Sequence, residues 1–290
     1  MGFAESAANA ARSAASTGFG RIGRYDVAQP QFPQTELDLT PRWQPLLNPH
    51  AASGDDQTSP GMARRKWPGP GGTNAELNNI LHEYQVQDDV VLTDWELPWP
   101  YSQVMDPVSQ ITQTEVDMLM DLALSPPNPV GDALAVRQFE QDHNDAFNDA
   151  DARYPRNESE ELSINDNHND AFRHAYWNAL LTRDFGEKWA AQFATAHEGL
   201  PNSLPTREAM DLYNNQVGRE IAAAHPLASP AQLADFIQQA ISDGKLLVVD
   251  KSGNLAWSNQ VPVGQCGTAQ PADPLPGRPR EDFNGTTSGR

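Results

Sequence analysis

Hydrophobic residues in the second half of the chain recur mainly at helical spacing. The longest such stretch, 130–154, carries one apolar stripe with members at i, i+4, i+7, i+8, i+11 and i+15. These members are Phe139, His143, Ala146, Phe147, Ala150 and Tyr154. Pro155 ends the pattern, and the same period predicts further helices over about 169–183, 187–198 and 206–224.

Capping signals predict two helices upstream of this region. Thr73 with Glu76, and Thr112 with Glu115, set a hydroxyl three residues before a glutamate, which is the pattern of a capping box. Apolar residues at helical spacing follow each pair. Residues 90–101 are rich in β-branched and aromatic side chains before their prolines, so we expect a short strand there.

The last regular elements are a helix and a hairpin. Ser229 and Pro230 begin the helix, and Gly244 ends it. Residues 245–258 then carry apolar residues on both sides of a Lys-Ser-Gly-Asn turn, which is typical of a β-hairpin. The expected fold is therefore mainly α: a compact bundle of about five or six helices with a small C-terminal β-hairpin, flanked by irregular Pro/Gly-rich arms.

The two flanks lack a sustained apolar period. Residues 1–72 pass from Ala/Ser-rich to Pro/Gly-rich sequence, which predicts an extended or flexible N-terminal arm, with a docking or export segment as the alternative. Residues 261–290 are rich in Pro, Gly and Thr, and we expect a disordered tail. The helical domain is expected to occupy 73–260.

Charge and cysteine usage narrow the classes of function. The 290 residues include 20 Lys+Arg and 39 Asp+Glu, a net charge of −19, so bulk charge repels phosphate backbones and no stable nucleic-acid binding is expected. Cys266 is the only cysteine, which rules out an intrachain disulfide. No apolar run reaches the roughly 18 residues of a transmembrane helix, and the N-terminus lacks the apolar core of a signal peptide. We expect a protein that is cytoplasmic in its producer and is secreted or delivered into a target cell without an N-terminal signal peptide.

Unusual polar residues lie on the predicted helix 169–183. Asp170, His174 and Asn178 are spaced i, i+4 and i+8 and share one face, with Arg173 beside them. A surface helix normally carries Glu and Lys, whereas these short or planar groups suit ligands, protons and phosphates. The alternative is a hydrogen-bonded polar seam between helices.

The next helix brings a second histidine to an inward face. His197 follows the stripe of Trp189 and Phe193, and Glu198 comes directly after it. A single inward histidine is more often a satisfied core residue than a ligand. Here the preceding helix offers partners that could face it.

The third helix places Asn214 at an inward position, with Asp211 and Asn215 flanking its stripe. A buried asparagine must find partners or cost about 1–3 kcal/mol. Gly218 follows one turn later and would let another backbone approach closely.

A metal site is the first chemistry that fits these helices. His174 and His197 would bind a divalent ion with one or more carboxylates from Asp170, Glu198 and Asp211. Two histidines and a carboxylate with an open position form the hydrolytic zinc pattern, in which the metal lowers the pKa of bound water to about 7. The order of these residues differs from the HExxH signature.

An acid–base site without a metal ion is the second chemistry that fits these helices. His174 would act as general base, oriented by Asp170 or Asp211, and Arg173 would stabilise a developing anion. His168, at the start of the helix, would serve either scheme or cap the helix. The assigned catalytic positions are Asp170, Arg173, His174, His197 and Glu198. The assigned substrate-binding positions are His168, Asn178, Asn214 and Asn215.

The pentapeptide HNDAF occurs twice, at 143–147 and at 168–172. The neighbouring sequences agree at little more than Ala150 with Ala175, so we interpret the match as coincidence rather than duplication. His143 lies on the apolar stripe of its helix, and we expect it to have a packing role.

Three motifs together resemble an uncharacterised bacterial domain family. They are NDAFRHAYWNALLT (169–182), AHE (196–198) and MDLYNNQVGREIA (210–222), within a resemblance that covers roughly 115–260. Its members are similar to C-terminal modules of wall-associated, Rhs-type and other polymorphic-toxin proteins. The family's motif positions fall on Asp170, Arg173, His174, His197, Glu198, Asp211, Asn214 and Asn215. The resemblance implies the context of delivered effectors and interbacterial toxins, and it carries over no established reaction.

The expected function is that of a secreted antibacterial effector domain, a metal-dependent hydrolase acting on envelope or lipid substrates, with Zn²⁺ as the ion. One alternative is a metal-independent His/Asp acid–base hydrolase or a nuclease. Another is a non-catalytic binding or structural module. The expected partners are a cognate immunity protein and a component of a secretion apparatus.

Overall fold

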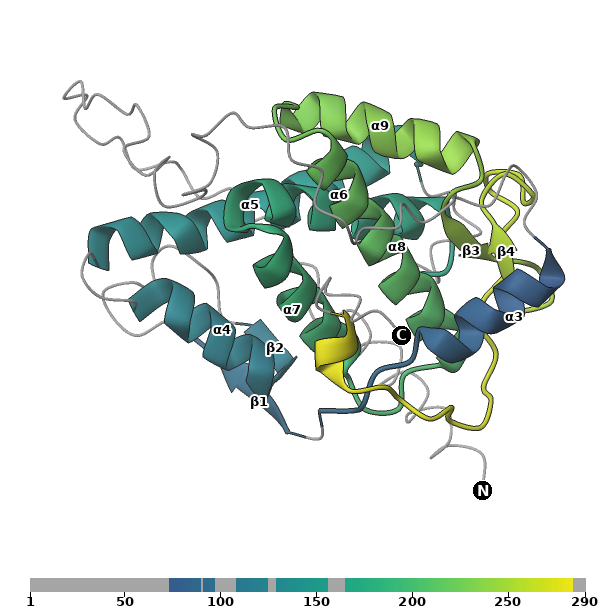
Figure 1. The fold of residues 1–290 in the computed structure, drawn as a ribbon, viewed down its shortest axis with the longest axis horizontal. Coiled ribbons are helices and arrows are strands. Elements are labelled where there is room, and N and C mark those ends of the chain that lie inside the picture. Colours follow the sequence, from purple (N-terminus) through teal and green to yellow (C-terminus); the bar gives the residue numbers. More distant parts are fainter. Residues whose placement is uncertain (1–72, 90, 97–107, 125–128, 156–164, 284–290) are drawn as a thin grey trace, which may run out of the picture.

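The computed structural model describes residues 73–283 of the chain, apart from residues 90, 97–107, 125–128 and 156–164. Within these residues the chain forms seven α-helices and two antiparallel pairs of short strands (Figure 1). In chain order the elements are α3 (Asn74–Glu83), β1 (Leu92–Trp95), β2 (Val108–Thr112), α4 (Gln113–Leu124), α5 (Pro129–Arg153), α6 (His168–Phe185), α7 (Glu187–Glu198), α8 (Pro205–Ala224), α9 (Pro230–Ser242), β3 (Leu247–Val249), β4 (Leu255–Trp257) and the 3₁₀ helix η2 (Arg280–Phe283). The predicted mainly α fold with a small C-terminal hairpin is confirmed. The predicted N-terminal arm lies outside the described residues. Among those residues, no helix has the length and apolarity needed to cross a bilayer.

The helix starts follow the local capping chemistry. At α4 the Thr112 N–H donates to Glu115 Oε2 at 2.7 Å, and the Glu115 N–H donates to Thr112 Oγ1 at 3.2 Å, which completes the predicted capping box. At α3, the Thr73 hydroxyl accepts from the Glu76 N–H at 3.3 Å. These side chains satisfy backbone donors that have no partner inside the helix.

Helix α6 runs through the centre of the bundle, in contact with α5, α7, α8 and α9. Every residue from His168 to Leu181 is buried, so the polar face of this helix is enclosed along with its apolar face. The two backbones come close at Gly218 of α8, where an added Cβ would lie 1.9 Å from the carbonyl oxygen of Ala175 in α6. The predicted close backbone approach at Gly218 is confirmed, and no larger side chain fits there.

An aromatic cluster joins α5, α6 and α7. The ring of Phe139 lies 4.9 Å from that of Phe193 and 5.8 Å from that of Trp177. Trp189 stacks on Phe193 at 5.2 Å. Phe139 is fully buried, as the apolar stripe of α5 predicts. The packing of these rings holds α5 and α7 against α6.

The predicted hairpin forms as β3 and β4, which pair antiparallel with Leu247 opposite Trp257. Both strands are buried on both faces, and all of their residues, Leu-Val-Val and Leu-Ala-Trp, are apolar. The strand predicted within 90–101 is β1, and it pairs with β2, which the sequence pattern did not indicate.

Residues 261–283 pack against the domain, and the prediction of a disordered tail is wrong for them. The Gly267 N–H donates to the carbonyl of Val249 at 2.9 Å. Further along, Arg278 exchanges backbone hydrogen bonds with Gln85 and Gln87, at 2.7 and 3.0 Å. These contacts use backbone groups, so they leave no apolar period in the sequence from which to predict them.

Candidate metal centre

The start of α6 is fixed by a buried ion pair. Asp166, which has a left-handed φ of 75°, accepts two hydrogen bonds from Arg207, at 2.9 and 2.6 Å. The Asp166 N–H donates to Asp170 Oδ2 at 2.6 Å, and the cap residue Asn167 accepts from the Asp170 N–H at 3.1 Å. These bonds orient the Asp170 carboxylate, which is fully buried.

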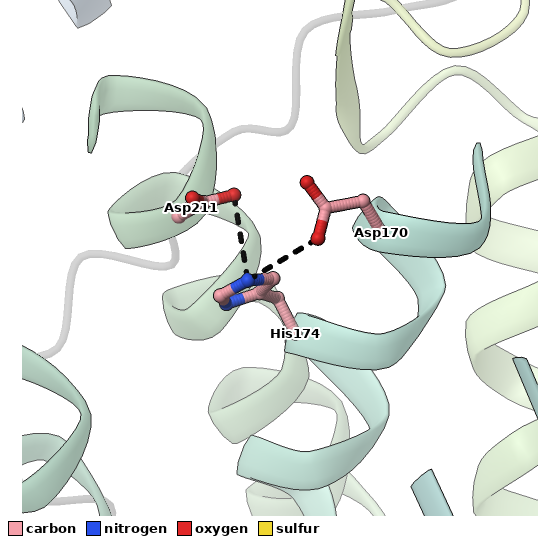
Figure 2. A group of neighbouring side chains, drawn as sticks. All are labelled: Asp170, His174 and Asp211. Carbon is pink, nitrogen blue, oxygen red and sulfur yellow. Dashed lines mark ion pairs between the residues drawn. The ribbon is translucent and has the colours of Figure 1, made fainter. Parts of the chain in front are cut away.

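Asp170, His174 and Asp211 converge between α6 and α8 (Figure 2). Asp170 lies one helical turn before His174, and its Oδ1 is 3.4 Å from His174 Nε2. From α8, Asp211 Oδ1 comes within 3.6 Å of the same nitrogen. One ligand atom from each residue lies within 4.8 Å of the other two. The predicted pairing of Asp170 with His174 across one turn, and the contribution of Asp211, are therefore present in the fold.

The geometry of these three groups fits a metal ion. Ligands about 2.0–2.2 Å from a tetrahedral centre are separated from each other by roughly 3.3–3.6 Å. The distances from His174 Nε2 to Asp170 Oδ1 and Asp211 Oδ1, 3.4 and 3.6 Å, match this separation. Asp211 Oδ1 is also buried and has no hydrogen-bond partner among the described residues. A cation between the three ligands would satisfy that oxygen. The cluster can therefore hold a metal ion.

The opposite nitrogen of His174 contacts polar groups from α7 and α8. His174 Nδ1 lies 3.2 Å from Asn215 Oδ1 and 3.4 Å from Glu198 Oε1. Asn215 Nδ2 donates to the same Glu198 oxygen at 3.1 Å. The structure thus brings Glu198 and Asn215 to His174, on the side away from Asp170 and Asp211.

A buried polar seam continues from Asn215 along α6 and α8. Asn178 Nδ2 donates to Asn215 Oδ1 at 2.7 Å and to the backbone carbonyl of His174 at 3.1 Å. Arg219, which is 5 % exposed, donates to Asn178 Oδ1 at 2.8 Å. The sequence analysis missed Arg219, although it follows Asn215 by four residues on α8 and so shares its face. The hydrogen bonds of Asn178 match the polar-seam interpretation, and this seam lies one turn of α6 beyond the cluster of Asp170, His174 and Asp211.

Arg173 forms a buried ion pair with Asp170. Its guanidinium carbon also lies 4.7 Å from the centre of the Phe147 ring, a cation–π contact with α5. The upstream HNDAF copy thus contributes one ring to the surroundings of the downstream copy. His143 from the upstream copy packs on Trp177 at 5.5 Å and is buried, consistent with a packing role.

The predicted second histidine ligand is not part of the cluster. His197 Nδ1 lies 2.9 Å from Glu115 Oε1 of α4. Burial alone would lower the pKa of His197, but the Glu115 carboxylate raises it above the ordinary value. The cluster that could hold a metal ion therefore contains one histidine and two aspartates rather than two histidines, because α7 directs His197 towards α4.

Asn214 and His168 also lie outside the cluster. Asn214 exchanges two hydrogen bonds with the backbone of Leu247 in β3, at 3.0 and 2.9 Å. His168 Nε2 contacts the carbonyl of Ser258 at 2.8 Å, and its Nδ1 lies 3.4 Å from Cys266 Sγ. Both residues join helices to the hairpin region, so the substrate-binding role predicted for them is replaced by a structural one.

The two aspartates of the cluster have opposite electrostatic settings. Burial raises the pKa of Asp170, but Arg173 and His174 outweigh it and hold the pKa below its usual range. Burial, followed by the nearby Asp170 and Glu198 carboxylates, raises the pKa of Asp211 well above its usual range. Two carboxylates that share one imidazole and differ in this way form a coupled pair, in which a bound cation would favour ionisation of both.

The cluster is enclosed but not sealed. The side chain of Asp170 is fully buried, whereas those of His174 and Asp211 each keep 6 % of their surface exposed. Glu198 and Arg173, beside them, keep 9 % and 10 %. Any substrate contact therefore occurs through small exposed edges of these four side chains.

One family model matches the chain, over residues 130–245, and its description is "Domain of unknown function (DUF6973)". The match begins within α5 and ends after α9, so it contains the three ligand residues together with Glu198, Asn215 and Arg219. It excludes Glu115, the partner of His197. No curated protein and no solved structure matches the chain.

Proposed function

We propose that Asp170, His174 and Asp211 bind one divalent metal ion, with Zn²⁺ the expected ion, and that the domain is a metal-dependent hydrolase. The observation that carries the proposal is the buried Asp211 Oδ1, which lacks a hydrogen-bond donor among the described residues and faces His174 Nε2. One imidazole nitrogen and two carboxylate oxygens leave a fourth position open, as catalytic zinc sites do.

A divalent ion at this position would polarise a substrate oxygen and activate water. The residues around the cluster have separate parts in this scheme. Asn215 and Glu198 orient the His174 ring through its Nδ1. Arg173 neutralises Asp170 and, with 10 % of its side chain exposed, suits an anionic group such as a phosphate or carboxylate on the substrate.

A metal-independent acid–base hydrolase is the alternative that the same contacts favour. A protonated His174 would satisfy both Asp170 and Asp211 at the distances observed, and it could transfer its proton to a leaving group. The two schemes differ in their response to a chelator.

Metal analysis of the purified full chain tests the first scheme. Elemental analysis after dialysis, and titration calorimetry of chelator-treated protein with Zn²⁺, Mn²⁺ and Mg²⁺, should show one bound ion. Binding should be lost in His174→Ala and Asp211→Asn and kept in His82→Ala, which removes an exposed histidine of α3. Equal binding in His174→Ala would place the metal elsewhere. Hydrolysis that survives the chelator but fails in His174→Ala would favour the acid–base scheme.

We further propose that the protein is a delivered antibacterial effector that acts on the envelope or lipids of a target cell. The resemblance of its three motifs to modules of polymorphic-toxin proteins supports this proposal. A secretion-apparatus component and a cognate immunity protein would be its partners, and delivery would not require a signal peptide. Expression in a test bacterium, directed separately to cytoplasm and periplasm, should arrest growth in one compartment, and His174→Ala should relieve it. Normal growth in both compartments would refute the effector proposal and leave the metal site unaffected.

A further inference from the structure

The hydrogen bonds that lead to His174 have a fixed direction, because they begin at an arginine. Arg219 carries only donors, so the Asn178 oxygen must face it, at the observed 2.8 Å. The Asn178 amide nitrogen therefore points the other way, towards Asn215. Its second hydrogen bond, to the carbonyl of His174, also requires a donor at this atom.

The orientation of Asn215 and the position of the proton on the His174 ring follow in the same way. Because Asn178 donates, Asn215 must present its oxygen, and its amide nitrogen then donates to Glu198. His174 Nδ1 lies 3.2 Å from this oxygen, which can only accept. His174 Nδ1 must therefore carry a proton. In the neutral ring, Nε2 is then left with a lone pair that faces Asp170 and Asp211.

We propose that Arg219 is a positioning residue that sets the tautomer of His174 through Asn178 and Asn215. A neutral imidazole in water prefers the opposite tautomer, with its proton on Nε2. The chain of hydrogen bonds from Arg219 through Asn178 and Asn215 to His174, which we call the relay, reverses this preference. It directs the metal-binding lone pair of His174 between two carboxylates. The proton on Nδ1 follows from the hydrogen bonds alone, and the use of the Nε2 lone pair in binding an ion rests on the proposed function.

Because the side chains of the relay are buried, each amide has only one favourable orientation. Arg219, Asn178 and Asn215 are each at most 5 % exposed, so water does not replace a mismatched partner. A wrong orientation of any one amide would set donor against donor or acceptor against acceptor. Ordinary packing of α6 against α8 would not need this polarity, since apolar side chains of similar size would fill the same space.

Two Asn→Asp variants test the direction of the relay. Asn178→Asp still accepts from Arg219 but cannot donate to Asn215. Asn215 should then turn its amide nitrogen towards the new carboxylate and His174, exchanging its bond to Glu198 for one to residue 178, and move the ring proton to Nε2. Asn215→Asp still accepts from Asn178 and from His174, so the proton should stay on Nδ1. Both variants add one negative charge at buried positions of the same seam, which makes each a control for the other.

The readout is the ¹⁵N chemical shifts and couplings of the His174 ring in chelator-treated full chain, raised in pH until the ring is neutral. An Nδ1–H ring in wild type and Asn215→Asp, with Nε2–H in Asn178→Asp, supports the relay. An Nε2–H ring in wild type, an unchanged tautomer in Asn178→Asp, or a ring doubly protonated up to pH 10 overturns it. If Asn178→Asp does not fold, Arg219→Lys and Arg219→Gln replace it. Lysine keeps the donor and the tautomer, whereas glutamine can present its oxygen and should lose the single tautomer.

Zn²⁺ titration separates this proposal from the proposed function. Asn178→Asp should bind Zn²⁺ about 10–100-fold more weakly than wild type, as expected when a group that orients a ligand is removed. If each protein has the expected His174 tautomer but neither wild type nor any variant binds Zn²⁺, the metal site is refuted and the relay is supported. Zn²⁺ binding of equal strength in wild type and Asn178→Asp, with one tautomer in both, would refute the relay and leave the metal site standing.

Discussion

Two buried aspartates, Asp166 just before α6 and Asp211 within α8, have opposite electrostatic surroundings. Asp166 accepts two hydrogen bonds from Arg207 and one from the Ala269 N–H, so its charge is compensated in full. Asp211 faces His174, has like-charged neighbours, and keeps an oxygen without a donor among the described residues. Native structures leave few buried polar atoms without a hydrogen bond, and each such atom calls for an explanation. The contrast separates a structural ion pair from a cluster that could hold a metal ion.

The largest effect on stability is expected at Asp166, whose charge is fully compensated by its hydrogen-bond donors. Arg207→Leu would leave the Asp166 charge buried without its partner and should lower the free energy of unfolding by about 3–5 kcal/mol. Urea denaturation followed by circular dichroism measures this change. The double variant with Asp166→Asn should recover part of the loss. A loss below about 1 kcal/mol for the single variant would mean that the two aspartates do not differ in this way.

The metal should stabilise the domain through Asp211. At a free ion concentration of one hundred times Kd, binding raises the stability of the folded state by about 2.7 kcal/mol. Thermal unfolding of chelator-treated wild type should therefore shift to higher temperature on addition of Zn²⁺, while Asp211→Asn should show no such shift. An equal shift in both proteins would remove Asp211 from the ligand set.

Asp142 on α5 is, like Asp211, a buried aspartate whose charge is not fully compensated by its neighbours. Its Oδ2 is buried without a hydrogen bond among the described residues, and burial, followed by Asp184, raises its pKa to about 8. The folded state then holds a proton that the unfolded chain releases near its ordinary pKa of 3.8. Stability should therefore fall as pH rises from about 4 to about 8.

Asp142→Asn isolates this contribution. The variant should lose the downward slope between pH 4 and 8 and be more stable than wild type at pH 9, measured by chemical denaturation at each pH. Asp117→Asn, an exposed change on α4, should leave the slope unchanged. A slope that persists in Asp142→Asn would show that other groups cause it.

The smallest effect concerns the upstream HNDAF copy. His143 packs on Phe147 and Trp177, and burial, followed by Arg173, lowers its pKa to about 3, so the ring is neutral in the folded protein. His143→Gln should lower stability by about 1 kcal/mol, a typical cost for a packing residue, and leave Zn²⁺ affinity unchanged. Reduced affinity at unchanged stability would instead assign His143 to the site.

The helices of this protein could be predicted closely from the sequence. Their starts and ends are marked by residues that act locally, such as Thr112 with Glu115 at α4 and Pro155 after α5. Helix α7 was expected over 187–198 and extends over Glu187–Glu198. Capping and periodicity involve neighbours within one or two turns, and these relations are present in the sequence itself.

The ligand cluster could be predicted in part. Asp170 and His174 are four residues apart, so the helical repeat alone places them on one face. Asp211 lies close to the inward Asn214, and this proximity indicated its side of α8. The error at His197 arose because an inward face has several possible partners, and the one it meets, Glu115, is 82 residues away in the chain.

The sequence thus determined which groups each helix presents, because the 3.6-residue period fixes directions within a helix. Tertiary structure decided which of these groups meet. The close crossing at Gly218 sets α6 against α8 so that Asp211 reaches His174 and Arg219 reaches Asn178. Distances between helices depend on how all their side chains pack together, and the pattern of one helix does not contain that information.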